Sequence, residues 1–229
     1  PEYTTIVNKT IYSLKAKWVI ISLRNWVYLV PQKEDLKLNE IDLLEKYYYE
    51  LLKKYITFYC MSDYYISWNK SLQLHLKDYQ VVDKIYIVNR KIDKKIKIWD
   101  YTIIFKTIKW NDKKKTKNLY SKMSSLVENI ELFWINFKVS CLELALVESA
   151  LITDNNEGID ITLINKALKK YSKFFDIEKF KFIWQFKFIM SFNRLKELSK
   201  NIDEKLYEVF LDIIKKNWGL FIWETLRKI

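Results

Sequence analysis

Glycine and proline are almost absent from this chain, with 2 residues of each among 229. Phosphate-binding loops need several closely spaced glycines, so the sequence excludes this class of nucleotide site. Turns must be built from Asn, Asp, Ser and Lys instead. No apolar run approaches the ~18 residues of a membrane-spanning helix and no signal peptide is visible, so we expect no membrane partner.

Histidine is limited to His75, and the two cysteines, Cys60 and Cys141, stand far apart. One histidine excludes metal sites built from several imidazoles. A Ser-His-Asp triad would have to use His75, and no Gly-x-Ser-x-Gly elbow accompanies it. We therefore predict no catalytic residue, no metal and no cofactor. Both cysteines are expected to be buried, reduced thiols in the cytoplasm.

Arginine is scarce, with 4 residues against 36 Lys, although the net charge is +12. The abundance of Lys, Ile, Asn, Tyr and Phe indicates an AT-rich genome, so part of the charge is compositional. Residues 84–117 hold 12 Lys or Arg against 3 Asp. Either their lysines protect edge strands from aggregation, or they form a basic surface for DNA, RNA or an acidic partner. Lys113, Lys114 and Lys115 are the centre of that candidate surface.

Aromatic residues are plentiful (9 Trp, 16 Tyr and 13 Phe), which is ample for a core. At the N-terminus, the apolar spacing predicts a helix over residues 6–17, capped by Thr4 or Thr5. Residues 19–23 and 26–30 are two predicted strands, joined by Arg24 and Asn25 into a hairpin. The helix has an apolar face (Val7, Ile11, Leu14, Trp18) and an opposite, polar face (Thr5, Lys9, Tyr12, Ser13, Ala16).

A helix followed at once by a hairpin is typical of the second half of a winged helix. The polar face suits a helix that enters a major groove, and Arg24 could reach a phosphate. An ordinary helix and hairpin with a solvated polar face is the alternative, and the residues alone do not separate the two.

Residues 31–37 form a polar link, which divides the chain into residues 1–35 and 36–229. The second part is predicted to open with a helix over residues 40–58, capped by Asn39, with Ile41, Leu44, Tyr48, Leu51, Leu52 and Tyr55 facing inward. Strands over residues 84–89, 95–99 and 101–110 are predicted to form an antiparallel meander with one wet face, followed by a mobile loop over 112–117 and a strand over 133–139.

The C-terminal part is predicted to be helical. Ser140 and Glu143 match a capping box that opens a helix over residues 141–152. Further helices are expected over 162–175, capped by Thr162, and over 176–190, 191–199 and 203–216. The aromatic residues between Phe174 and Phe188 are too many for one narrow stripe, so some should face a partner or a second core.

The central stretch of the chain carries a tyrosine pair, two serines and the histidine. Tyr64-Tyr65-Ile66-Ser67, then Ser71-Leu72, then His75 resembles the central signature of AbiEi-type antitoxins, the transcriptional regulators of type IV toxin–antitoxin systems. Arg24, Val27 and Tyr28 also fit the end of that family's winged helix. Considered alone, the same residues describe an extended strand entering a short helix, with Ser67 as its N-cap and His75 as a hydrogen-bonded structural residue.

The resemblance implies an α+β protein with an N-terminal winged helix followed by a mixed domain with a small antiparallel sheet and a helical C-terminal part. Two further helices should precede Pro1, so the winged helix is incomplete in this chain. The implied DNA contacts are Thr5, Lys9, Tyr12, Ser13, Arg24 and Asn25.

By the same resemblance, the protein is a bacterial repressor that binds an operator in double-stranded DNA and regulates its own operon. It would counter a nucleotidyltransferase-type toxin without forming a stable complex with it. The two proteins would belong to an abortive-infection system. Such toxins carry an Asp-x-Asp pair, which this chain lacks, so it is predicted to be the antitoxin type. The alternative from another class is a non-enzymatic basic module that binds RNA or an acidic protein.

Overall fold

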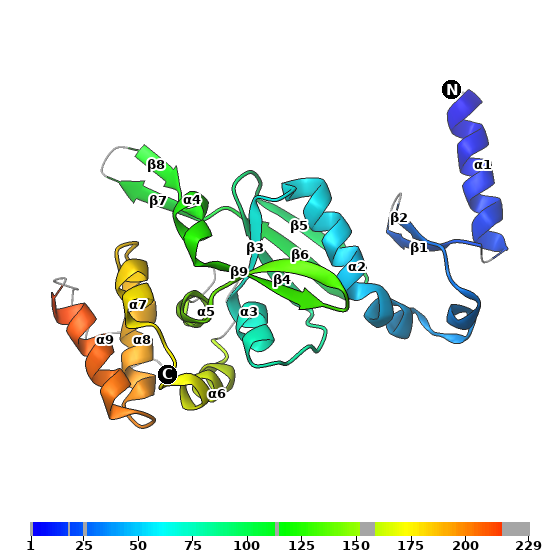
Figure 1. Ribbon diagram of the computed structural model, residues 1–229. Helices are drawn as coiled ribbons and strands as arrows, with labels where there is room; N and C mark the ends of the chain where they lie inside the picture. Colours follow the sequence, from blue (N-terminus) through cyan, green and yellow to red (C-terminus); the bar gives the residue numbers. More distant parts are fainter. Residues whose placement is uncertain (1, 18, 25–26, 113–114, 152–158, 217–229) are drawn as a thin grey trace.

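The computed structural model describes residues 2–17, 19–24, 27–112, 115–151 and 159–216. Its architecture is mixed α+β, with a six-stranded sheet, two separate hairpins and a helical C-terminal part (Figure 1). The predicted α+β class is therefore confirmed. The winged helix stays a prediction, because the described residues before the linker form one helix and one hairpin.

The N-terminal unit consists of α1 (Glu2–Ala16), β1 (Ile21–Arg24) and β2 (Val27–Leu29), and it projects away from the sheet (Figure 1). The three predicted apolar positions of α1 that are described, Val7, Ile11 and Leu14, are half-buried. The predicted cap is wrong, because α1 begins at Glu2 and both threonines lie inside it. Trp18 and Asn25 lie outside the described residues.

A short 3-10 helix, η1 (Lys33–Lys37), connects this unit to α2 (Glu40–Cys60). Its Asp35 is 1% exposed and accepts hydrogen bonds from Lys46 Nζ and Tyr47 Oη, each at 2.6 Å. The backbone N–H of Gln32 donates to the same carboxylate at 2.7 Å. We call this group the Asp35 clasp, because it holds the linker against α2.

Helix α2 agrees closely with its prediction. The side chain of Asn39 accepts from the backbone N–H of Asp42, as an N-cap does. All but one of the predicted inward positions are buried. The exception is Ile41, which is 59% exposed because the first turn of α2 extends beyond the strands (Figure 1).

The main sheet has the strand order β5-β6-β4-β3-β10-β9. Its strands are β3 (Tyr64–Ser67), β4 (Lys84–Asn89), β5 (Lys94–Ile98), β6 (Tyr101–Lys106), β9 (Val127–Leu132) and β10 (Ile135–Ser140). The predicted antiparallel meander is wrong, because β4 runs parallel to β6 and β3 runs parallel to β10. Strand β9 was not predicted.

The prediction that one face of the sheet is exposed to solvent is also wrong for the inner strands. Five of the six residues of β4 are buried, and four of six in β6, because helices cover both faces of the sheet. Continuous apolar runs such as Ile85–Val88 are typical of strands covered on both faces. Only the edge strand β5, among the described strands of this stretch, alternates exposed lysine with buried isoleucine.

The two faces of the sheet belong to two apolar clusters. Helix α2 covers one face, where Ile56 and Leu52 pack with Ile66, Ile87 and Phe105. Helices α3 (Trp68–His75) and α5 (Leu142–Ser149) cover the other face, on the opposite side of the strands (Figure 1). Cys60 lies in the first cluster and Cys141 in the second, and both are buried free thiols, as predicted.

The stretch after β6 forms a second hairpin, β7 (Lys109–Asp112) with β8 (Lys115–Asn118). Backbone pairing therefore replaces the loop predicted over 112–117, apart from 113–114, which lie outside the described residues. The predicted strand over 101–110 is divided between β6 and β7. A short helix α4 (Tyr120–Met123) and a 3-10 turn η2 (Ser124–Leu126) lead into β9.

The C-terminal part consists of α6 (Ile161–Tyr171), α7 (Ile177–Trp184), α8 (Ile189–Ser199) and α9 (Glu204–Lys216). Asp160 caps α6 in place of the predicted Thr162, and the predicted helix over 176–190 breaks at Lys187, where φ is 63°. Phe180, Phe192 and Phe210 are fully buried and pack against one another. The aromatic run thus extends the apolar cluster on the α3 and α5 side of the sheet, although Phe174 remains 77% exposed.

Candidate functional site

The predicted signature residues lie on β3 and α3, at the centre of the sheet and on the helix that follows it. Successive residues of a strand point to opposite faces, so Tyr64 and Tyr65 separate. Tyr64 lies with the α2 cluster, where its hydroxyl oxygen accepts from Lys53 Nζ at 3.1 Å. Tyr65, Ser67, Ser71 and His75 all face α5 or the end of β10, so the fold unites four of the five.

The first half of this network is centred on Glu148, near the end of α5. Tyr65 donates its hydroxyl to Glu148 Oε1 at 2.9 Å, and Ser67 donates to Oε2 at 2.6 Å. Ser67 does occupy the N-cap position of α3, but its hydroxyl makes no cap bond. The predicted capping role of its side chain is therefore wrong, because the carboxylate of Glu148 takes that hydroxyl.

Burial controls the ionisation of this group. Glu148 is fully buried, and desolvation raises its pKa to about 7, against the lowering effect of the bonds from Ser67 and Tyr65. Burial and the neighbouring Glu148 also hold the pKa of the Tyr65 hydroxyl well above its ordinary value. At neutral pH, Glu148 is thus protonated in some molecules and ionised in the others.

The second half of the network closes on Ser140, the last residue of β10. Ser71 donates to the carbonyl oxygen of Ser140 at 3.1 Å and accepts from the Ser140 hydroxyl at 2.8 Å. His75 Nε2 lies 2.7 Å from the same carbonyl, so this nitrogen carries the proton. The hydroxyl of Tyr171, on α6, donates to the backbone carbonyl of His75 at 2.5 Å.

Ser140 and Glu143 do not form the predicted capping box. Ser140 ends a strand and bonds to α3, while Glu143 Oε1 accepts from the backbone N–H of Asp176 at 2.8 Å. Sequence reasoning missed Glu148 altogether. Its signal was available: a lone carboxylate within the apolar run from Leu144 to Leu151 requires buried donors if that run forms a core helix.

The predicted DNA contacts on α1 share one property, which is exposure. Thr5, Lys9 and Ser13 are exposed, and Tyr12 is 76% exposed. Arg24 ends β1, and its side chain is not described; Asn25 lies outside the described residues. Lys15 Nζ lies 5.1 Å from the ring centre of Tyr28, so the helix and the hairpin contact each other.

The predicted basic surface is only partly visible. Lys113 and Lys114 lie outside the described residues, and Lys115 begins β8 with its side chain not described. The described lysines of β5 are informative instead. Lys95 and Lys97 are exposed on the outer strand of the main sheet, which is where charged side chains discourage pairing with another chain.

Within the described parts of the chain, no three His, Cys, Asp or Glu side chains gather as metal ligands do. In the same parts, no helix has the length and apolar character needed to cross a bilayer. Comparison of the sequence and the fold with protein-family models, curated proteins and solved structures gives no match.

Proposed function

We propose that this protein is a DNA-binding transcriptional repressor of the antitoxin type. The observation that carries the proposal is the outward polar face of α1, formed by Lys9, Tyr12 and Ser13 beside a two-stranded hairpin. Figure 1 shows α1 standing clear of the main sheet, so a duplex can approach it along its length.

The physical requirements of groove entry support this proposal. A major groove admits one helix, and the helix must offer side chains that donate and accept hydrogen bonds with little bulk around them. The backbone of α1 is free of covering elements on its polar face, since all of its polar positions with described side chains are exposed. The net charge of +12 attracts the phosphates of any duplex.

The antitoxin part of the proposal rests on the signature network in residues 36–229. Tyr65 and Ser67 bond β3 to α5, while Ser71 and His75 bond α3 to the end of β10, so four of the residues that carry the resemblance share one hydrogen-bonded network. We propose that this domain, in the cytoplasm, opposes a nucleotidyltransferase-type toxin without forming a stable complex, and that the chain has no catalytic activity of its own.

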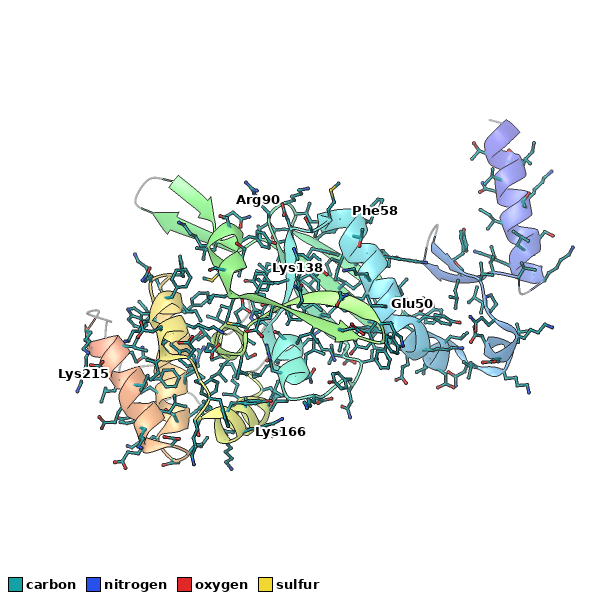
Figure 2. The ribbon with its side chains drawn as sticks, viewed as in Figure 1. Glu50, Phe58, Arg90, Lys138, Lys166 and Lys215 are labelled. Carbon is teal, nitrogen blue, oxygen red and sulfur yellow. The ribbon has the colours of Figure 1, made fainter. Side chains whose placement is uncertain are left out.

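A gel-shift titration against the DNA upstream of the operon tests the first part. Lys9→Ala should weaken binding and lower the salt slope by about one, as expected for the loss of one phosphate contact. Lys166→Ala is the matched control, because Lys166 is an exposed helical lysine far along the chain on α6 (Figure 2). Equal affinity of Lys9→Ala and the unmodified protein would overturn the proposal.

Co-expression tests the second part with the full chain. A Lys9→Ala/Ser13→Ala double variant should lose promoter repression while it still rescues growth from a nucleotidyltransferase toxin encoded in the adjacent reading frame. Loss of rescue by a folded double variant would show that the two roles share α1.

The lysines of β5 favour a second candidate, a basic module that binds RNA or an acidic protein. Lys95 and Lys97 present two charges on one exposed strand. Under this alternative, Lys95→Glu/Lys97→Glu should abolish RNA binding, whereas Lys9→Ala should leave it unchanged. The opposite pattern supports the repressor.

A further inference from the structure

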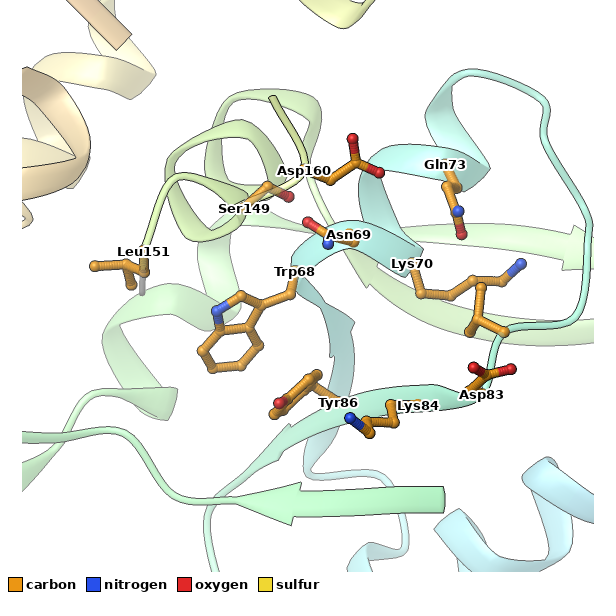
Figure 3. A pocket seen from close by; sticks show the side chains of 11 residues that line it. Trp68, Asn69, Lys70, Gln73, Asp83, Lys84, Tyr86, Ser149, Leu151 and Asp160 are labelled. Atoms are coloured by element: carbon orange, nitrogen blue, oxygen red, sulfur yellow. The ribbon is translucent and has the colours of Figure 1, made fainter. Parts of the chain in front are cut away.

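A pocket of about 360 Å³ opens between the start of α3, the start of β4 and the C-terminal end of α5. This volume lies within the roughly 300–1,000 Å³ of small-molecule sites. Figure 3 shows side chains from these three elements around it, with Trp68 and Tyr86 on one side and Lys70, Gln73 and Asp83 on another. It adjoins the network around Glu148, because Trp68 and Ser149 directly follow Ser67 and Glu148 in the chain.

Three polar atoms at this pocket are buried and make no hydrogen bond within the described part of the chain. They are Trp68 Nε1, Gln73 Oε1 and Ser149 Oγ. Trp68 is 7% exposed and Ser149 is 2% exposed. Buried polar groups are nearly always paired, so three unpaired ones around one hollow indicate that something else supplies their hydrogen bonds.

The backbone at Trp68 is strained, with a φ of 54° in a residue that carries a bulky side chain. Such conformations persist where the surrounding structure holds them and cluster at ligand sites. The strain places the indole against Tyr86, with ring centres 4.9 Å apart and planes tilted by 43°. Both residues are 7% exposed.

The charges around the pocket balance. Lys70 and Lys84 line it together with Asp83 and Asp160. The amine of Lys70 already donates to the backbone carbonyl of Gln80, and burial lowers its pKa to about 8. A fixed cation surplus of the kind that selects phosphate is therefore missing among these described residues, which favours an uncharged ligand.

The unpaired atoms define the complementary pattern on that ligand. The indole N–H only donates, the Gln73 carbonyl oxygen only accepts, and the Ser149 hydroxyl does both. We propose that the pocket binds an uncharged nucleobase or nucleoside, whose flat ring carries donors and acceptors along its edge. This inference goes beyond the repressor function and does not depend on it.

Nuclear magnetic resonance of the full-length protein, with its tryptophan indoles labelled with ¹⁵N, tests the proposal. Trp68→Phe assigns the Trp68 resonance by its disappearance. Adenosine, guanosine, cytidine and uridine are then titrated separately into the unmodified protein. At least one of them should shift the Trp68 indole resonance saturably, and Trp68→Phe should bind that nucleoside about fivefold to tenfold more weakly, as expected for one lost hydrogen bond.

Two serines provide a matched pair of variants. Ser149 and Ser191 are both buried, and neither hydroxyl is hydrogen-bonded within the described residues, but only Ser149 lines this pocket. Ser149→Ala should weaken nucleoside binding by a similar factor, while Ser191→Ala should leave it unchanged. Trp184→Phe, which changes a tryptophan of equal exposure on α7, is the corresponding control for Trp68→Phe.

Three results would overturn the inference. The first is the absence of a saturable shift with all four nucleosides, as expected if water alone fills the pocket. The second is a shift of the Trp68 indole resonance with ribose or inorganic phosphate that is at least as large as the shift with any nucleoside. The third is an equal loss of affinity in Ser149→Ala and Ser191→Ala, which would indicate a general effect on packing.

Discussion

Helices α1 and α3 contain similar polar residues and use them in opposite ways. On α1, Lys9 and Ser13 are exposed, whereas on α3 Lys70 and Ser71 are buried and hydrogen-bonded. The contrast teaches that polar residues at helical spacing define a face but not its depth in the fold. A polar face can be a surface for a partner or the inner lining of a domain.

The largest loss of stability is expected at Glu148, which accepts the buried hydrogen bonds from β3. Glu148→Ala leaves the hydroxyls of Tyr65 and Ser67 buried without an acceptor and creates a cavity. The free energy of unfolding should fall by roughly 3–5 kcal/mol in urea titrations. Glu208→Ala, at an exposed position of α9, should change it by less than about 0.5 kcal/mol. Similar losses in both variants would contradict the inward role of Glu148.

The dependence of stability on pH sharpens the comparison. The pKa of Glu148 is about 7 in the folded protein and 4.5 ordinarily, so between these values the folded protein retains a proton that the unfolded chain has lost. The free energy of unfolding should therefore fall by about 3 kcal/mol as the pH rises from 4.5 to 7. Glu148→Gln should remove this slope, and an unchanged slope in urea titrations across pH would refute the assignment.

At the Asp35 clasp, the dependence of stability on pH should have the opposite sign to that at Glu148. Hydrogen bonds from Lys46 and Tyr47 lower the pKa of Asp35 to about 2, so its stabilising contribution is present above pH 3.8 and is lost as the pH falls toward 2. Asp35→Asn should free the linker at neutral pH. Trypsin should then cleave severalfold faster at the exposed Lys33 and Lys37, as followed by mass spectrometry.

The matched control for the clasp is Glu34→Gln, which changes an exposed carboxylate one residue away. Its cleavage rate should equal that of the unmodified protein. Faster cleavage in both variants would attribute the effect to net charge rather than to the clasp.

The smallest effect is expected on α1. Ser13→Ala should change the free energy of unfolding by less than about 0.5 kcal/mol, because this hydroxyl is exposed. Ser71→Ala, the same substitution on α3, should lower it by about 1–3 kcal/mol, because Ser140 loses one of its buried hydrogen-bond partners. Thermal unfolding of the two variants side by side measures the difference, and equal melting temperatures would break the comparison.

The elements that sequence predicts well are those governed by local rules. Helix α2 has a cap, Asn39, and a regular apolar face, and its start is predicted to the residue. Strand β4 is also predicted with its observed bounds, because its apolar run is short and bounded by polar residues. Local patterns say nothing of which strands become neighbours, so the parallel pairing of β4 with β6 was missed.

The candidate site likewise has a part that the sequence predicts and a part that it does not. The central signature directed attention to Ser67 and His75, and both are hydrogen-bonded in the fold. Their partners, Glu148 and Ser140, lie far along the chain, and no spacing rule connects them. The pocket beside Trp68 was not foreseen either, because it depends on how the end of α5 meets β4.

The parallel pairing of β3 with β10 also determines the order in which parts of the fold can form during synthesis. Tyr65 and Glu148 are 83 residues apart. At 5–20 residues per second, a ribosome needs roughly 4–17 s to deliver the second after the first. Until residue 140 has been added, β3 lacks β10, one of its two neighbouring strands. The outward helix α1 is thus made early and Glu148 late, so a chain released before residue 148 carries the exposed face of α1 but lacks the acceptor for Tyr65 and Ser67.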